Sequence, residues 1–148
     1  RSSSESIDPL LSYAITQYIY IKTIATNQSL FRVYIEASEI DSVRKEYLKT
    51  LGEILKANLR ELNFDFKEND ISLSIVIGSA GEDELLRRFY KNDINLTLDE
   101  IIESTIKTRL LLLNISQEKV IQIISDTKDS TNNIEINEII KNINILDI

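Results

Sequence analysis

The sequence contains no cysteine and no histidine, so the side chains that most often carry catalysis and bind transition metals are missing. Without them the chain cannot form disulfides, Ser–His or Cys–His nucleophile pairs, or the usual zinc sites. An enzyme built from this chain would have to work with carboxylates, lysine, tyrosine or serine, and these residues form no recognisable catalytic constellation. We therefore expect a protein that is not an enzyme, with no metal site and no cofactor.

Long apolar runs are missing too. The run of leucines at 110–113 is far shorter than the 18 or so residues that a membrane span needs, so we expect no membrane segment. Residues 1–6 lack the apolar segment of a secretory signal, which predicts a flexible tail and a cytoplasmic protein. The chain has 148 residues, of which 43% are hydrophobic and 28% charged, so residues 7–148 are expected to form a single compact domain.

Basic side chains are outnumbered by acidic ones, 17 to 24, which gives a net charge of −7. This sign disfavours a protein that binds polyanions without specificity. A local basic surface is still compatible with this net charge. Salt screens interactions between charges more than about 8–10 Å apart, so a ligand responds to the nearby charged patch more than to the net charge of the protein. Any nucleic-acid contact is therefore expected to be limited in area.

Helical patterns occupy both ends of the chain. Asp8 and Pro9 are a typical helix start, and residues 10–25 are apolar on nearly the whole circumference, which predicts a central or partner-docking helix. Thr97 and Glu100 form a capping box that opens a helix to about 114, and Ser116 caps another from 117 to about 125. We expect a polar loop at 126–133 and a last helix at 134–146.

The middle of the chain carries strand signals. Residues 30–36 alternate, with Phe31, Val33 and Ile35 on one face, which predicts a half-buried strand. Residues 64–66 and 71–77 predict a hairpin and 94–96 a brief last strand, with helices at 40–62 and 82–91. The predicted fold is α+β, mainly helical, with a small antiparallel sheet within 30–96 and helical parts at 7–26 and 97–148. A ferredoxin-like β-α-β-β-α-β unit at 30–96, flanked by helices, is the alternative.

Two of the three glycines, Gly78 and Gly81, lie between the expected strand at 71–77 and the expected helix at 82–91, where phosphate loops occur. No Walker or GxGxxG motif is present, and the acidic triplet 82–84 that follows would repel a phosphate. Consecutive helical residues also point about 100° apart, so the triplet cannot converge on a metal ion. We interpret the segment as a turn followed by an acidic first helical turn.

Two groups of basic residues are candidates for nucleic-acid binding. On the helix at 40–62 four cations fall within a sector of about 60° and span about 22 Å, enough to follow several phosphates; these are Lys45, Lys49, Lys56 and Arg60. Gly52 lies in the same sector, where it would lower the profile of this stripe. A second group, Arg87, Arg88 and Lys91, shares one side of the helix at 82–91. Either group could instead be an ordinary solvated face held by ion pairs.

The layout of the chain resembles a known family. A small chain without histidine or cysteine, an apolar first helix at 7–22, a modest β portion and a helical C-terminal half resemble the small subunit of archaeal type I-A CRISPR interference (Cascade) complexes. The resemblance implies a non-catalytic, cytoplasmic protein of antiviral defence that packs beside other Cascade subunits. It would help to bind CRISPR RNA or single-stranded or target DNA, weakly on its own. Self-association is a further option.

A small interaction protein without a nucleic-acid role is the alternative. Such an adaptor or accessory protein would dock its partners through apolar helix faces, as amphipathic helices do in grooves. The largely apolar helix at 10–25 and the isoleucine-rich C-terminal helices would be the candidate faces.

Overall fold

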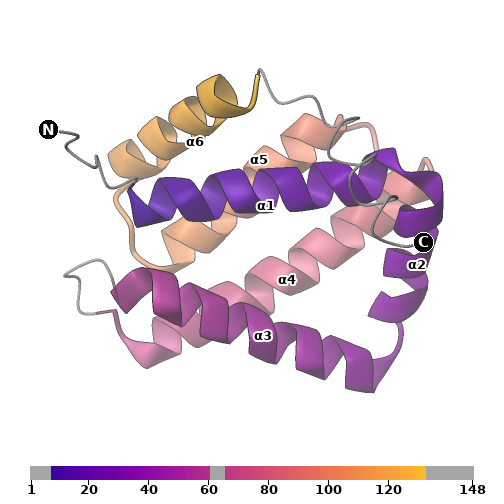
Figure 1. Cartoon of the computed structure of the whole chain (residues 1–148), viewed down its shortest axis with the longest axis horizontal. Coiled ribbons are helices and arrows are strands. Elements are labelled where there is room, and N and C mark those ends of the chain that lie inside the picture. The colour runs from indigo at the N-terminus through magenta and orange to yellow at the C-terminus, as the bar shows by residue number, and fades with distance from the viewer. Residues whose placement is uncertain (1–7, 61–65, 133–148) are drawn as a thin grey trace, which may run out of the picture.

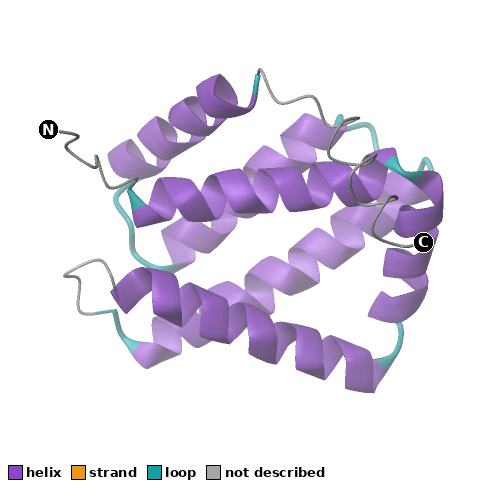
Figure 2. Ribbon diagram, viewed as in Figure 1, coloured by secondary structure: helices purple, strands orange, loops and turns teal. Residues whose placement is uncertain are grey.

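The described part of the chain is entirely helical (Figures 1 and 2). The computed structural model describes residues 8–60 and 66–132, and these residues form six helices and no strand. The helices are α1 (Pro9–Thr26), α2 (Gln28–Ser38), α3 (Asp41–Arg60), α4 (Glu68–Tyr90), α5 (Leu98–Leu112) and α6 (Gln117–Thr131). Within these residues no helix is both long and apolar enough to cross a membrane.

The predicted α+β fold is therefore wrong, and so is the ferredoxin-like alternative. The expected strand at 30–36 lies in α2, and the expected strand at 71–77 lies inside α4, whereas 94–96 is a loop. Alternating apolar residues misled the prediction because positions i and i+4 of a period-two pattern also share a helix face. Phe31 and Ile35 are buried in this way, while Val33 between them is 56% exposed.

Several predicted helix ends are confirmed, because their signals are local. The Asp8 side chain accepts a hydrogen bond from the Leu10 N–H at 3.0 Å, with Pro9 in the first turn. Thr97 and Glu100 form the expected capping box of α5. Ser116 caps α6 by accepting from the Lys119 N–H.

Other boundaries differ from the prediction. The polar segment expected as a loop at 126–133 continues α6 as far as Thr131, and the hydroxyls of Thr127 and Thr131 donate to carbonyls one turn back. Asn92 and Asn114 have positive φ and end α4 and α5, as asparagine can in the left-handed conformation. The expected tail at 1–6, residues 64–65 of the expected strand at 64–66, and the helix at 134–146 lie outside the described residues, and residue 66 is not in a strand.

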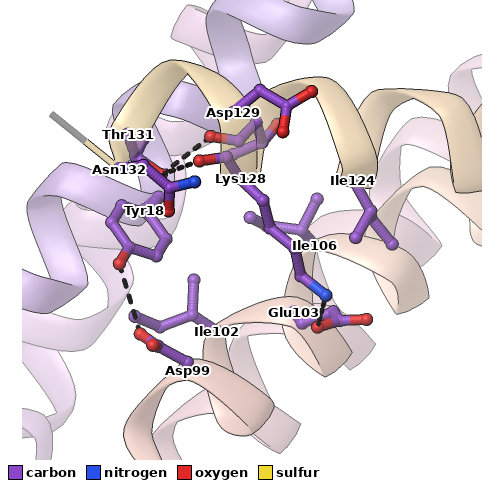
Figure 3. A pocket seen from close by; sticks show the side chains of 11 residues that line it. Tyr18, Asp99, Ile102, Glu103, Ile106, Ile124, Lys128, Asp129, Thr131 and Asn132 are labelled. Carbon is purple, nitrogen blue, oxygen red and sulfur yellow. Dashed lines mark hydrogen bonds and ion pairs between the residues drawn. The ribbon is translucent and has the colours of Figure 1, made fainter.

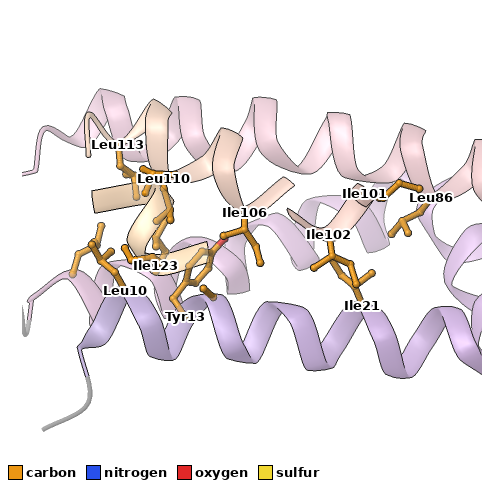
Figure 4. Packing of buried hydrophobic residues seen from close by; sticks show 14 of the residues in the cluster. Leu10, Tyr13, Ile21, Leu86, Ile101, Ile102, Ile106, Leu110, Leu113 and Ile123 are labelled. Atoms are coloured by element: carbon orange, nitrogen blue, oxygen red, sulfur yellow. The ribbon is translucent and has the colours of Figure 1, made fainter. Parts of the chain in front are cut away.

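Helix α1 is central, as its apolar circumference predicts. It crosses the middle of Figure 1 with α6 above it and α3 and α4 below, and it packs against α2, α3, α5 and α6. One cluster of buried side chains receives residues from all six helices, and Figure 4 shows part of it, with Leu10, Tyr13 and Ile21 of α1 next to isoleucines and leucines of α5. The most extensive packing joins α4 to α5, and that pair encloses the polar residues described next.

Candidate functional site

A cluster of polar side chains lies inside the protein between α1, α4 and α5. The Glu82 carboxylate of α4 and the Arg109 guanidinium of α5 form an ion pair, with 3.1 Å between Oε2 and Nη2, and their side chains are 0% and 4% exposed. Oε2 also accepts a hydrogen bond from Gln17 Nε2 of α1 at 2.7 Å. Arg109 donates further to the Tyr13 hydroxyl at 3.1 Å and to Ser79 Oγ at 3.0 Å.

Gly78 makes room for this ion pair. A Cβ at position 78 would overlap Cγ of Arg109 and lie 2.8 Å from its Nε, so only glycine lets the arginine stem pass this close to α4. Ser74, one turn earlier, donates to the Arg109 carbonyl at 2.9 Å. The turn expected at 78–81 is thus wrong, because these residues continue α4, and Gly78 and Ser79 among them contact Arg109.

Asp83, the next residue in α4, points toward two other helices. Its Oδ1 accepts a 2.6 Å hydrogen bond from the Tyr34 hydroxyl of α2, and its Oδ2 lies 3.6 Å from Nη2 of Arg44 on α3. Two consecutive acidic residues of α4 therefore bind four helices, Glu82 binding α1 and α5 and Asp83 binding α2 and α3. The acidic triplet was interpreted as a first helical turn, and this is wrong, because the triplet lies in the middle of α4.

The electrostatics of the cluster follow from its burial. Burial raises the pKa of the Glu82 carboxyl, and the neighbouring Arg109 charge opposes this effect without cancelling it. Burial alone would lower the pKa of Arg109, but the Glu82 carboxylate, Tyr13 and Tyr47 together outweigh burial and raise that pKa, so the guanidinium stays charged. Burial also raises the pKa of Tyr13 and Tyr34, which keeps both hydroxyls protonated, and the Tyr34 hydroxyl donates to Asp83.

This cluster is enclosed and joins helices, and none of its members lines the cavity described below. Glu82 Oε1 and Arg109 Nε are buried without a hydrogen bond, so the ion pair is incompletely satisfied. Sequence reasoning missed it, although one signal was present. Arg109 occupies the same helix face as the buried Ile102, Thr105 and Ile106, and a cation on such a face indicates a buried partner.

One cavity of about 350 Å³ lies between α1, α5 and α6 (Figure 3). Ile102, Ile106 and Ile124 line it, and ion pairs and hydrogen bonds already occupy polar groups at its rim. Lys128 binds Glu103 at 2.9 Å, and the Tyr18 hydroxyl donates to Asp99 at 3.2 Å. Among the described residues, no group of three acidic side chains is placed to hold a metal ion.

The predicted basic stripe lies along α3, where Lys45, Lys49 and Arg60 are exposed and Lys56 is half-buried. Lys45 is 3.5 Å from Asp41, and Lys56 is 3.0 Å from Glu68 of α4. Lys49 and Arg60 make no ion pair with any residue that the structure describes.

Gly52 allows α3 to pack closely against α4, because a Cβ at this position would lie 3.2 Å from Cδ1 of Ile75. The expectation that Gly52 lowers the surface between the cations of the stripe does not explain this glycine. The stripe therefore runs along the border between α3 and α4.

The second basic group lies at the end of α4. Arg87 and Arg88 both bind Glu84 at 2.9 Å. Asp83 takes no part in this group, because it points inward toward Arg44 of α3. Arg87 also reaches Glu39, just before α3, so this group and the α3 stripe lie on neighbouring helices. Lys91 is exposed.

The most unusual surface is one that the sequence analysis did not identify. Leu73, Val76 and Ile77 of α4 are 48%, 57% and 47% exposed, and Ala80 and Gly81 continue the same side of the helix at spacings of three and four residues. We call these five residues the outer face of α4. The strand expected at 71–77 concealed the pattern, since it placed Leu73 and Ile77 on the same side as the buried Ile71.

Comparison with known proteins identifies no relative. No protein-family model, no curated protein and no solved structure matches this chain.

Proposed function

We propose that the protein is a non-catalytic assembly subunit that binds protein through the outer face of α4. The observation that carries this proposal is the exposure of three large aliphatic side chains at helical spacing on one helix. Single exposed apolar residues are common on protein surfaces, but a contiguous row of them is typical of an interaction site. Covering the exposed half of each side chain would contribute about 1 kcal/mol.

The interior supports a structural rather than a catalytic use of the polar residues. The chain offers neither histidine nor cysteine, and the strongest concentration of charge, Glu82 with Arg109, is enclosed by packed helices. A catalytic acid or base must reach the proton it transfers, directly or through one water. At the rim of the cavity between α1, α5 and α6, Tyr18 is bound to Asp99 and Lys128 to Glu103, so these groups hold each other rather than converging on a substrate.

Affinity purification of the tagged protein from its own cells tests this function. Ile77→Glu places a charge in the outer face of α4, and Ile121→Glu is a matched control, because Ile121 is 59% exposed on α6. We expect a stoichiometric protein, either a second chain or another copy of this one, to be retained by the control and lost by Ile77→Glu. Equal recovery with both variants would contradict the proposal.

Nucleic-acid support along α3 is a second candidate function. Lys49 and Arg60 favour it, because both are exposed and neither forms an ion pair with a described residue, which leaves them available for phosphates. In this role the chain would be a cytoplasmic subunit beside other proteins of a Cascade-type complex, as the resemblance implies. One feature on which that resemblance was based, the modest β portion, is absent from the described residues, which contain no strand.

Charge reversal separates this candidate from the first. Lys49→Glu with Arg60→Glu should weaken binding of single-stranded DNA or RNA and lower the salt slope by about 0.7 for each lost phosphate contact. The control, Lys107→Glu with Lys128→Glu, changes the net charge equally on exposed residues of α5 and α6. If both pairs of substitutions leave binding and its salt slope alike, the α3 stripe has no role in nucleic-acid contact.

A further inference from the structure

Charge is distributed asymmetrically along α4. Its first turn holds Glu68 and Asp70, and its last turn holds Arg87 and Arg88. The outer face of α4 lies between these two ends. A helix that is acidic at one end, apolar in the middle and basic at the other is complementary to itself when two copies run antiparallel, whereas parallel copies would oppose like charges.

The three glycines of the chain give an independent observation. Gly52 and Gly78 each have a neighbour, Ile75 or Arg109, that a Cβ would crowd. At Gly81 a Cβ would meet no described residue within 4 Å beyond its own helical turn, although glycine inside a helix lowers the stability of the helix. The fold of one chain thus explains two of the glycines, and close approach of another chain would explain the third.

From these observations we infer that the partner of the outer face of α4 is a second copy of this chain, with the two α4 helices antiparallel across a two-fold axis. This inference rests on the proposed function and names its partner. A closed two-fold contact uses the same surface on both copies, so a single face suffices.

The spacing of residues on α4 sets the register of the pair. At about 100° per residue, the positions that face outward include Asp70, Leu73, Ile77, Gly81 and Arg88, within a sector of about 100°. A two-fold axis at the level of Ser79 along the helix then places Ile77 against Gly81 of the partner subunit, near the centre. It also places Asp70 against Arg88 of the partner subunit, at both ends.

Two of the terminal charges, Asp70 and Arg88, are accessible for such pairs. Among the described residues Arg88 pairs with the exposed Glu84, and Asp70 accepts from the neutral side chain of Asn114 at the surface. With 23 residues, α4 is about 34 Å long, so a single helix pair forms a small interface. We therefore expect reversible dimers with a dissociation constant on the order of micromolar or weaker.

Sedimentation equilibrium between about 1 µM and about 1 mM protein tests the dimer. The unchanged protein and the Ile121→Glu control should dimerise, whereas Ile77→Glu should stay monomeric. Gly81→Leu is a second variant that should fold, since the position is open in the monomer, yet it should lose the dimer because it blocks close approach. A monomer at every concentration, or a dimer insensitive to both α4 substitutions, would overturn the inference.

The orientation can be tested by disulfide formation, because the chain has no cysteine of its own. Ala80→Cys lies beside the axis and should cross-link to itself under mild oxidation. Asn69→Cys lies in the first turn, far from the axis, and should cross-link only when mixed with Arg88→Cys. Self-cross-linking of Asn69→Cys would show a parallel pair and overturn the inference. A monomeric protein whose Ile77→Glu variant loses a different protein would overturn it while leaving the proposed function intact.

Discussion

Glu82 and Arg109 face each other inside the protein, with 3.1 Å between Oε2 and Nη2 and with both side chains almost fully buried. Gln17 donates to the same carboxylate oxygen, so α1, α4 and α5 meet at one acceptor. The Asp83 carboxylate likewise connects α4 to two further helices, through Tyr34 of α2 and Arg44 of α3. The interior of α4 therefore organises the helices, and the side of α4 that remains exposed is available for assembly.

Removing the buried cation should destabilise the fold strongly. Arg109→Met leaves the Glu82 carboxylate without a counter-ion in the interior, which is expected to cost about 3–5 kcal/mol. Adding Glu82→Gln to the same protein removes the unpaired charge and should restore part of the loss. Urea denaturation of the two single variants and the double variant measures the coupling. Additive effects of the two substitutions would show that the pair does not act as a unit.

The glycines of α4 should respond in opposite directions to alanine. Gly78→Ala forces a methyl group into the Arg109 stem and should destabilise the protein by about 1–3 kcal/mol. Gly81→Ala meets no neighbour and should stabilise it by about 0.5–1 kcal/mol through helix propensity. Thermal denaturation at low protein concentration, where the monomer dominates, compares them. Stabilisation by Gly78→Ala would contradict the close packing of Arg109.

Two tyrosine–aspartate hydrogen bonds offer a matched comparison. Tyr34→Phe removes the donor to the buried Asp83 and should cost about 1.5–3 kcal/mol, as bonds to buried charged groups do. Tyr18→Phe removes the donor to the exposed Asp99, and its cost should stay below about 0.5 kcal/mol. Chemical denaturation gives both values. Equal costs would show that Asp83 is not held by the Tyr34 hydroxyl.

Asp8 should contribute stability that depends on pH. Burial alone would raise the pKa of Asp8, but hydrogen bonds from Lys119 and from the Leu10 N–H outweigh burial and hold that pKa below its ordinary value of 3.8. The folded state thus binds this proton less readily than the unfolded state does. The stabilisation is complete above the unfolded pKa and is lost as the pH falls through the folded one.

The Asp8→Asn variant isolates this effect, because asparagine can still cap α1. Its stability deficit relative to the unchanged protein should be constant above about pH 5 and should shrink toward zero under acidic conditions. Urea denaturation from about pH 2 to about pH 7 measures the difference. A deficit that grows as the pH falls would contradict the lowered pKa.

Features that depend on neighbouring residues could be predicted from the sequence, whereas features that depend on packing could not. The starts of α1, α5 and α6 could be predicted because each cap involves residues two or three positions apart, such as Thr97 with Glu100. The expected strand at 71–77 could not be excluded from the sequence alone. Its apolar residues alternate as in a strand and also recur every four residues as in a helix, where Ile71 and Ile75 face the interior while Leu73 and Ile77 face solvent.

The polar cluster needed information that the sequence does not carry locally. Gln17 and Glu82 are separated by 65 positions, and only the packing of α1 against the α4–α5 pair brings them together. All the basic candidates except the half-buried Lys56 and Arg87 are exposed, because lysine and arginine lie opposite the apolar stripe of their helix. Their use in binding nucleic acid is still a prediction.

Methyl-group NMR on serial dilution tests the central claim most directly. Leucine, valine and isoleucine methyl signals report the surroundings of individual side chains, and several exposed ones serve as internal controls. If two copies pair through α4, the signals of Leu73, Val76 and Ile77 should shift with protein concentration, while those of the exposed Val33 and Ile121 should stay constant. Concentration-independent signals from Leu73, Val76 and Ile77, or shifts confined to Val33 or Ile121, would contradict the account.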